Sequence, residues 1–390
     1  MLEHNKPATR SVYFSEEHEM LRAQVRRFVE EEIKPHAAAW EEQGFTPREV
    51  LRKMGELGFL GIRYPAEYGG SEMNTLGSVV LAEELGRSTF SGVAVTVLVH
   101  TDMASVHVFN AGSKAQKDRY MPDIVAGKKI VAVAVTEPGA GSDVKGIRTS
   151  ARRDGDHYVL NGAKMFITNG VHADLYCVAV RSDPNARPSQ SVSMILVEKG
   201  TPGFRVSRAL DKTGWRSSDT AELVFEDCRV PAENILGAEG SGFYSIMKNF
   251  QNERTVIAAM ATGEAETALE ITLNWVRDRK AFGAPLWEKQ AIRARLAELA
   301  AKVEAGRQLV HHAAWLDAQG FDAVKEVSMA KAYCGELVNE VMYACVQFHG
   351  GMGYMRESAI ERMSRDARVQ SIGGGATEVM LEEIAKRIAR

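Results

Sequence analysis

The sequence predicts a multidomain α+β protein: a helical N-terminal domain, a central antiparallel β-domain and a C-terminal four-helix bundle. The apolar period changes from helical to strand-like near residue 128 and returns to helical near residue 240. The length of 390 residues also exceeds what a single hydrophobic core usually reaches. We therefore expect three domains, at residues 1–128, 129–240 and 241–390.

The first third of the chain predicts helices. Ser15 followed by two glutamates marks a helix start, and residues 46–49 read as a capping box with Pro47 at the first helical position. Residues 74–85 predict a further helix. Residues 92–109 are apolar almost all round, which predicts a buried helix.

Between residues 128 and 240 the pattern predicts a series of six or seven strands with no helix among them, which indicates an antiparallel domain. Asp154-Gly155 is a two-residue hairpin signal. The expected strands are 130–135, 150–153, 156–160, 176–180, 192–197, 204–206 and 222–225.

After Pro231 the helical period returns, and four long amphipathic segments predict the bundle. A shorter helix is expected at 357–363. The four long segments are 243–277, 287–319, 322–348 and 377–390.

Composition narrows the class of protein. With 51 acidic and 48 basic residues the net charge is −3, which gives no attraction to nucleic acid or an anionic membrane. The first thirteen residues are polar and no apolar run is long enough for a membrane span, so we expect neither a signal peptide nor a span. Four scattered cysteines without CxxC pairs predict no disulfide framework and no metal site, and fit a cytoplasmic location.

Two stretches rich in glycine and hydroxyl groups, 135–143 and 161–170, are candidate ligand loops. Their backbone N–H groups and hydroxyls could grip an anionic or polar heterocycle, although each stretch alone could be only a tight turn. The glycines at 139 and 141 are not a dinucleotide-binding turn, because a hairpin follows them where a helix should begin.

Glu253 is the candidate base. It lies on an apolar helical seam at spacings of three and four residues, where burial would raise its pKa and fit it to accept a proton near neutral pH. Alternatively, it pairs with Arg254 or another cation, or the seam faces water. The other seam positions are Ile246, Phe250, Ile257 and Met260.

The two loops resemble the two most diagnostic loops of the acyl-CoA dehydrogenase family, and the resemblance extends over nearly the whole chain. Residues 279–283, 347–351 and 366–368 match further family segments in order and spacing. The resemblance implies the three-domain fold predicted above, with FAD bound between the β-domain and the bundle.

The resemblance also implies site residues. Arg279, Phe282, Gln290, Gln347, Gly350 and Gly351 would hold the pyrophosphate and adenine end of FAD from a neighbouring subunit, which implies a homotetramer. Ser142, Arg254 and Gly374 would contact the acyl-CoA substrate. The flavin end of the cofactor would be held by Val135, Thr136, Ser142, Phe166, Ile167, Thr168, Thr377 and Glu378.

One position departs from the common family pattern. Many members carry the catalytic glutamate where this chain has Gly374, whereas the long-chain and isovaleryl types carry it on the bundle helix just before an arginine, which is Glu253 here. The chain also resembles bacterial citronellyl-CoA-type dehydrogenases. The seam pattern and the resemblance thus select the same residue.

The resemblance implies α,β-dehydrogenation of an acyl-CoA thioester to trans-2-enoyl-CoA, as in fatty acid β-oxidation. Glu253 would remove an α-proton, the N–H of Gly374 would support the thioester oxygen, and a hydride would pass to FAD. We expect a medium-to-long straight acyl chain and an electron-transfer flavoprotein as electron acceptor. The alternatives are a branched or terpenoid acyl-CoA, or a non-catalytic relative that only binds acyl-CoA.

Overall fold

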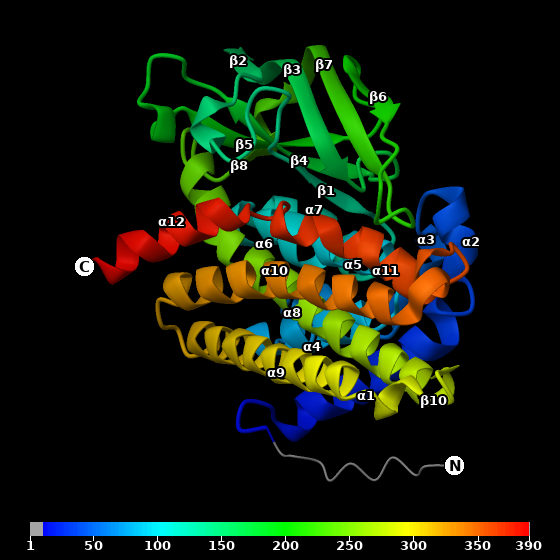
Figure 1. Cartoon of the computed structure of the whole chain (residues 1–390). Helices are drawn as coiled ribbons and strands as arrows, with labels where there is room; N and C mark the ends of the chain where they lie inside the picture. The colour runs from blue at the N-terminus through cyan, green and yellow to red at the C-terminus, as the bar shows by residue number, and fades with distance from the viewer. Residues whose placement is uncertain (1–10, 390) are drawn as a thin grey trace.

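The computed structural model describes residues 11–389 and places one sheet above a body of helices (Figure 1). Residues 1–10 of the polar N-terminal stretch (1–13) and the last residue of the final predicted helix lie outside the described residues. The expected order of helices, sheet and helices is confirmed. The N-terminal helices are α1 (Glu16–Phe28), α2 (Ala37–Gln43), α3 (Arg48–Glu56), α4 (Thr75–Gly86), α5 (Ser91–Leu98), α6 (Ser105–Ala111) and α7 (Lys114–Val125), with π-helical turns η1 (Val29–Ile33) and η3 (Val99–Ala104).

Side-chain caps begin three of the helices, α1, α4 and α7. The Ser15 hydroxyl accepts a hydrogen bond from the His18 amide before α1, as the sequence predicts. The capping box predicted at residues 46–49 is wrong. Helix α3 begins at Arg48 without a side-chain cap, because the Thr46 hydroxyl donates instead to the carbonyl oxygen of Ser217 in the β-domain, at 2.8 Å.

The predicted buried helix at residues 92–109 is confirmed. Helix α5, turn η3 and helix α6 form one helical segment, Ser91–Ala111, which is long and apolar enough to cross a membrane, so the expectation that no segment has this length and composition was wrong. However, 94% of its apolar window is buried inside the protein, which is the position of a core helix. The π-helical turn in its middle contacts the region described below as the candidate site.

The sheet has strand order β6-β7-β3-β2-β4-β5-β8, with β1 beside β4. The expectation of a wholly antiparallel sheet needs one correction, because β1 pairs in parallel with β4 and β2 adds a single parallel pair at the other end of β4. The intervening β2–β3 hairpin supplies the crossover that a parallel pair requires. The strands are β1 (Val131–Ala134), β2 (Ser150–Asp154), β3 (His157–Thr168), β4 (Leu175–Arg181), β5 (Val192–Glu198), β6 (Phe204–Ala209), β7 (Thr220–Pro231) and β8 (Ile235–Leu236).

The second candidate loop is mostly a strand. Residues 161–168 continue β3, paired with β7, and the register shifts twice, between Leu160 and Gly162 and between Lys164 and Ile167. Such irregularities bend a strand, so the glycine and asparagine that suggested a loop mark bulges instead. The predicted hairpin is present, but its turn is at residues 155–156, one position later than expected.

The C-terminal helices pack as predicted around one long helix. Helix α8 packs against α9, α10 and the N-terminal α4, while α12 packs along α10. A β-carbon on Gly263 would lie 2.1 Å from the carbonyl oxygen of Glu83, so only glycine allows α4 and α8 to approach this closely. The elements are α8 (Gly242–Asp278), β9 (Lys280–Ala281), β10 (Ala284–Pro285), α9 (Gln290–Ala318), α10 (Val324–His349), α11 (Ala359–Ala367), the 3-10 turn η9 (Arg368–Ser371) and α12 (Thr377–Ile388).

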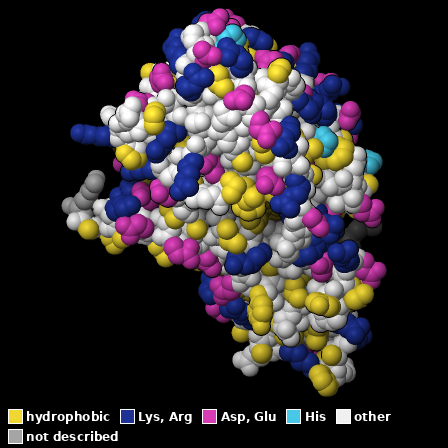
Figure 2. Space-filling view, turned by 90° about the horizontal axis from the view of Figure 1, so that it is seen from above, with side chains coloured by type: hydrophobic (Ala, Val, Ile, Leu, Met, Phe, Trp, Pro, Cys, Tyr) yellow, Lys and Arg dark blue, Asp and Glu magenta, His cyan; other side chains and the backbone are white. Residues whose placement is uncertain are grey.

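The surface seen from above the sheet carries lysine and arginine side chains interspersed with aspartate and glutamate (Figure 2). Neither sign gathers into one large area on this face, in keeping with the near-neutral composition.

Candidate active site

Glu253 lies in the middle of the buried face of α8. Its side chain is 8% exposed, and Ile246, Ile257 and Met260 on the same face are buried as well. Among residues 11–389 the carboxylate makes no ion pair within 4 Å, with Arg254 or with any other cation. Burial raises the pKa of Glu253 to about 7, which suits a carboxylate that must take up a proton near neutral pH.

Asn249 is the hydrogen-bond partner of this carboxylate. Its amide nitrogen donates to Glu253 Oε1 at 3.0 Å and to the carbonyl oxygen of Met103 at 3.0 Å. Sequence reasoning missed Asn249, although a buried polar residue four positions before Glu253 on the same helix face was a usable signal. The contact with Met103 ties α8 to the π-helical turn η3.

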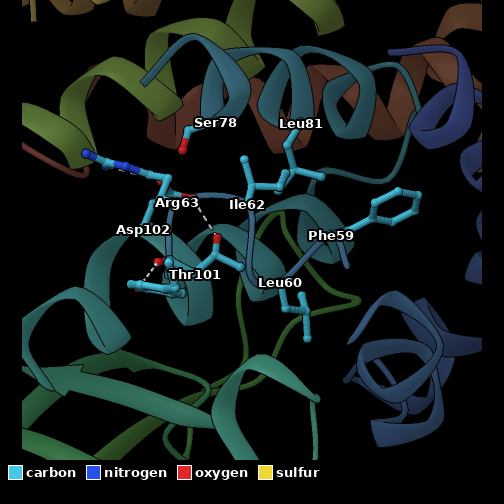
Figure 3. A pocket seen from close by; sticks show the side chains of 9 residues that line it. Phe59, Leu60, Ile62, Arg63, Ser78, Leu81, Thr101 and Asp102 are labelled. Carbon is cyan, nitrogen blue, oxygen red and sulfur yellow. Dashed lines mark hydrogen bonds and ion pairs between the residues drawn. The ribbon is translucent and has the colours of Figure 1, made fainter. Parts of the chain in front are cut away.

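A second tie between α8 and η3 runs through Asn252. Its amide donates to the carbonyl oxygen of Asp102 at 2.6 Å, and its side-chain oxygen accepts from Arg63. Figure 3 shows Arg63, Thr101 and Asp102 on one side of a small cavity, with Phe59 and Leu60 on the other. The cavity of about 10 Å³ holds at most a water molecule, so it belongs to the scaffold and is too small for substrate.

Turn η3 also contacts the strand that leads into the first candidate loop. The His100 ring accepts a hydrogen bond from the Val131 amide at 3.3 Å, at the start of β1. One π-helical turn therefore lies between Glu253 on α8 and the strand that precedes Val135 and Thr136. Single π-turns inside helices often mark functional sites.

The two candidate loops are joined by a buried ion pair that sequence reasoning also missed. Lys164 on β3 is fully buried, and its ammonium lies 2.8 Å from Glu137 and donates to the carbonyl oxygen of Val135 at 3.1 Å. The Met165 amide donates to the carbonyl oxygen of Thr136 at 2.9 Å. These bonds hold Val135 and Thr136 beside the end of β3.

The end of β3 presents an aromatic ring in a strained conformation. Phe166 has φ +61° and is 65% exposed, whereas its neighbour Ile167 is buried and Thr168 is half-buried and paired with Thr220. A positive φ costs an aromatic residue about 1–3 kcal/mol and recurs at ligand sites. Phe166 lies within the register shift between Lys164 and Ile167, where the pairing of β3 with β7 is interrupted. Ser142, at the end of the first loop, is exposed.

The glycine loop at 373–375 lies against α8 one turn beyond Glu253. Gly374 has φ +63°, and a β-carbon there would be 2.3 Å from Ile257 Cδ1. Gly375 has φ +103°, and its β-carbon position is 3.5 Å from Arg254 Nε. The glycine loop thus lies beside the segment of α8 that carries Glu253 and Arg254, and a side chain at position 374 would require Ile257 to move and the backbone to stay at a positive φ.

A second group of predicted site residues gathers at the other end of α8. The Trp275 indole donates to the carbonyl oxygen of Phe348 at 3.1 Å and stacks on His349, which joins the end of α8 to the end of α10. Phe282, in the β9–β10 hairpin, is 97% exposed with φ +52°. The exposed residues of this corner are Arg279, Phe282, Gln290, Gln347, Gly350 and Gly351.

Within one chain the predicted cofactor residues therefore form two groups. Figure 1 places the β9–β10 hairpin at the end of the bundle away from the sheet that carries Phe166. Thr377 and Glu378 begin α12 beside the glycine loop, where the Thr377 hydroxyl donates to Glu336 at 2.7 Å.

The residues present fit FAD. The exposed ring of Phe166 offers a face for stacking, and Thr168 offers a hydroxyl beside it. Gly139 and Gly141 have no atom within 4 Å of an added β-carbon, so a ligand can approach their backbone closely. At the second group, Gly350 and Gly351 are open in the same way beside exposed Arg279.

The chain matches one protein family over most of its described length. Residues 15–128, 132–228 and 240–389 match the N-terminal, middle and C-terminal domains of acyl-CoA dehydrogenase. The chain is 43% identical to the long-chain specific acyl-CoA dehydrogenase of Mus musculus mitochondria over 377 residues, which covers 96% of this chain and 87% of that protein. It is 37% identical to the mitochondrial isovaleryl-CoA dehydrogenase of Pongo abelii, over 94% of this chain and 87% of that protein.

Solved structures agree. A probable acyl-CoA dehydrogenase from Mycobacterium abscessus superposes with a TM-score of 0.93 at 46% identity, covering 96% of this chain and all of that one. A glutaryl-CoA dehydrogenase from Mycobacterium smegmatis, solved with FADH2, superposes with a TM-score of 0.91 at 29% identity, covering 96% and 95%. The chain therefore belongs to the acyl-CoA dehydrogenase family of flavin-dependent oxidoreductases, and its cofactor is FAD.

Proposed function

We propose that this enzyme oxidises a medium-to-long straight-chain acyl-CoA to the trans-2-enoyl-CoA, with Glu253 as the base. The observation that carries this proposal is the position of Glu253, buried, without an ion pair in residues 11–389, and one helical turn from the side chain that contacts Gly374. A carboxyl group with a pKa of about 7 is ionised in about half of the molecules at neutral pH, and the ionised form can accept the α-proton.

The α-proton of a thioester is weakly acidic, so its removal requires support for the oxygen that gains charge. The N–H of Gly374 makes no hydrogen bond to a backbone carbonyl within residues 11–389. By contrast, the amides of Ile372 and Gly373 both donate to the carbonyl oxygen of Val369. We assign the Gly374 amide to the thioester oxygen, with Arg254 near the CoA portion of the substrate. FAD, when bound beside Phe166 and Thr168, supplies the acceptor for the hydride that leaves the β-carbon.

The substrate proposal rests on similarity to the long-chain enzyme and on the glycine loop. Residues 373–375 carry no side chains and are partly exposed beside Glu253, which leaves space for an extended acyl chain. The competing proposal is a branched substrate, supported by the similarity to isovaleryl-CoA dehydrogenase.

A dye-reduction assay over matched straight, methyl-branched and terpenoid acyl-CoAs separates these substrates. We expect the highest kcat/KM for a straight medium or long chain. A maximum at isovaleryl- or citronellyl-CoA would replace the straight-chain proposal and leave the roles of Glu253 and Gly374 standing. No turnover with any acyl-CoA by the FAD-loaded enzyme would overturn the proposed reaction itself.

We also propose a homotetramer in which the corner around Phe282 completes the FAD site of a neighbouring copy. A phenylalanine that is 97% exposed, with arginine and two open glycines beside it, is costly in isolation and suits a contact with a second chain and its ligand. Light scattering should return the mass of four chains. A monomer that retains stoichiometric FAD would contradict this proposal.

Two further proposals concern the electron acceptor of the enzyme and its location in the cell. We propose an electron-transfer flavoprotein as the physiological acceptor, which reduction of that protein by the enzyme and acyl-CoA would test. We propose a cytoplasmic location, supported by four buried cysteines that form no disulfide, and cell fractionation would test it.

A further inference from the structure

Lys331, on α10, lies directly beneath the glycine loop. It is 1% exposed, and its ammonium donates to the carbonyl oxygen of Gln370 at 2.8 Å and to that of Gly375. These two carbonyl groups, one before the loop and one at its last residue, lie on either side of Gly374 in the chain. The buried ammonium of Lys331 therefore binds the segment 370–375 at both ends, and the Gly374 amide within this segment is the one assigned to the thioester oxygen.

The ammonium of Lys331 has no acidic partner. Among residues 11–389 no carboxylate lies within 4 Å of it, and burial lowers its pKa to about 8. Arg254, whose Nε lies 3.5 Å from the β-carbon position of Gly375, is also buried and without a carboxylate within 4 Å. A buried unpaired cation costs several kcal/mol, so two of them under one loop indicate a site prepared for negative charge.

Helix α10 also approaches the loop closely one turn beyond Lys331. A β-carbon on Gly335 would lie 2.8 Å from the carbonyl oxygen of Gln370. Glycine at 335 therefore allows the segment that leads into the loop to pack closely against α10. The position of the loop is thus set by α10 from two neighbouring points, one of them charged.

We propose that Lys331 is a positioning residue for the reaction, whose ammonium holds the carbonyls of Gln370 and Gly375 so that the Gly374 amide faces the thioester oxygen. This rests on the proposed function above. The same positive charge, with that of Arg254, favours the enolate-like oxygen that forms when Glu253 takes the α-proton. Lys331 itself neither gains nor loses a proton in this step.

The test measures proton removal separately from oxidation. The FAD-loaded enzyme is incubated in D2O with an octanoyl-CoA analogue whose β-carbon is replaced by sulfur, and deuterium entering the α-carbon is followed by mass spectrometry. This analogue has no β-hydrogen to lose, so only the base and the oxyanion contacts act. Lys331→Met should slow exchange at least about tenfold, which is less than the about 10²–10³-fold cost of losing an oxyanion donor outright, with enoyl-CoA affinity changed less than about threefold.

Two further variants sharpen the result. Lys325→Met removes the same charge from an exposed position on α10 and should exchange like the wild type. Gly335→Ala should slow exchange by pushing on Gln370 with the lysine intact, and it serves as the test if Lys331→Met does not fold. Lys331→Arg should recover part of the rate because it restores the charge.

The outcomes are distinguishable. If the wild type neither exchanges the α-proton nor oxidises any acyl-CoA, the proposed function fails. If the wild type exchanges and both Lys331→Met and Gly335→Ala match Lys325→Met, the proposal for Lys331 is overturned. A loss in thermal stability without slower exchange would likewise reduce Lys331 to a structural residue and overturn it.

Discussion

Helix α8 carries two buried carboxyl groups on one face, and they differ in what surrounds them. Glu253 and Glu264 are about three turns apart, within about 20° of the same direction and about 16 Å along the axis. Burial raises the pKa of both, to about 7 for Glu253 and about 8 for Glu264. By burial and pKa alone, Glu264 is as good a candidate base as Glu253.

The residues around Glu253 and Glu264 distinguish the two carboxyl groups. Glu253 keeps 8% exposure and shares its face with Ile257, which contacts the glycine loop. Glu264 is fully buried and accepts a hydrogen bond from the Gln370 amide, with the buried carboxyl of Asp366 close enough to raise its pKa further. A raised pKa therefore identifies a base only where a substrate can reach the carboxylate.

Activity should show the largest contrast. Glu253→Gln should lower kcat by about 10²–10⁴-fold, the usual contribution of a positioned general base, while FAD stays bound. Glu264→Gln makes the same isosteric change on the same helix face and should stay within about threefold of the wild type. Dye reduction with the preferred acyl-CoA measures both. Equal losses in the two variants would mean that the base has been misassigned.

The glycine loop at 373–375 is the second difference between the two glutamates, because it contacts α8 near Glu253. Gly374→Ala places a β-carbon 2.3 Å from Ile257 in a positive-φ conformation, which should cost about 1–3 kcal/mol of stability and about tenfold or more in kcat. The measurements are thermal unfolding and steady-state kinetics.

Gly373→Ala is the matched control for that change. Its added β-carbon would meet nothing closer than 3.6 Å, and Gly373 is not among the residues with positive φ. It should be nearly neutral in both measurements. If the two alanine variants behaved alike, the backbone of Gly374 would have no special part in the reaction.

The sequence predicted that Glu253 is a buried candidate base because the pattern that indicates this lies within one helix. Seam spacing along one helix shows which side chains share a buried face, and helix order shows the fold class. The loop at 373–375 could be placed beside Glu253 only through the family resemblance, since its contact with Ile257 joins residues far apart in the chain.

Other features escaped sequence reasoning because tertiary contacts decide them. The Thr46 hydroxyl bonds to the β-domain instead of capping α3, and the glycine at 162 marks a bulge in a strand instead of a loop. The ties from Asn249 and Asn252 to η3 depend on a π-turn that apolar spacing does not reveal. No local pattern indicated that Lys331 lies under the glycine loop.

The pH dependence of stability should show Glu264 more strongly than Glu253. The folded-state pKa of Glu264 is raised from 4.5 to about 8, so its contribution is present below about pH 4.5 and is lost as the pH rises toward and through 8. Glu264→Gln should remove this loss and stabilise the protein at pH 9 by a few kcal/mol, about 1.4 per pKa unit, relative to the wild type.

Denaturant unfolding at pH 5 and pH 9 measures that difference. At pH 5, which is only slightly above the unfolded-state pKa of 4.5, the two proteins should differ by less than about 1 kcal/mol. Glu253→Gln should show the same sign with a smaller gain, because the pKa of Glu253 is raised less. A wild type as stable at pH 9 as Glu264→Gln would show that Glu264 is not held protonated by burial.

The smallest effect we expect is a shift in the pH profile when Asn249 is changed. Its amide stabilises the Glu253 carboxylate and lowers the pKa of that group, opposing the larger effect of burial. Asn249→Leu removes the donor at similar volume, so the pKa should rise above about 7. Because the base must be ionised, the acidic limb of kcat should move to higher pH by up to about one unit.

Asn252→Leu separates this electrostatic effect from the loss of a tie to η3. Asn252 bonds to Asp102 in η3, as Asn249 bonds to Met103, but it makes no hydrogen bond to Glu253. Its loss should lower stability and leave the acidic limb in place. If both variants moved the limb equally, the pKa of Glu253 would depend on how η3 sits against α8, and the direct bond from Asn249 would matter little; if only Asn249→Leu moves it, this one hydrogen bond adjusts the base of the two-carboxyl helix to its working pH.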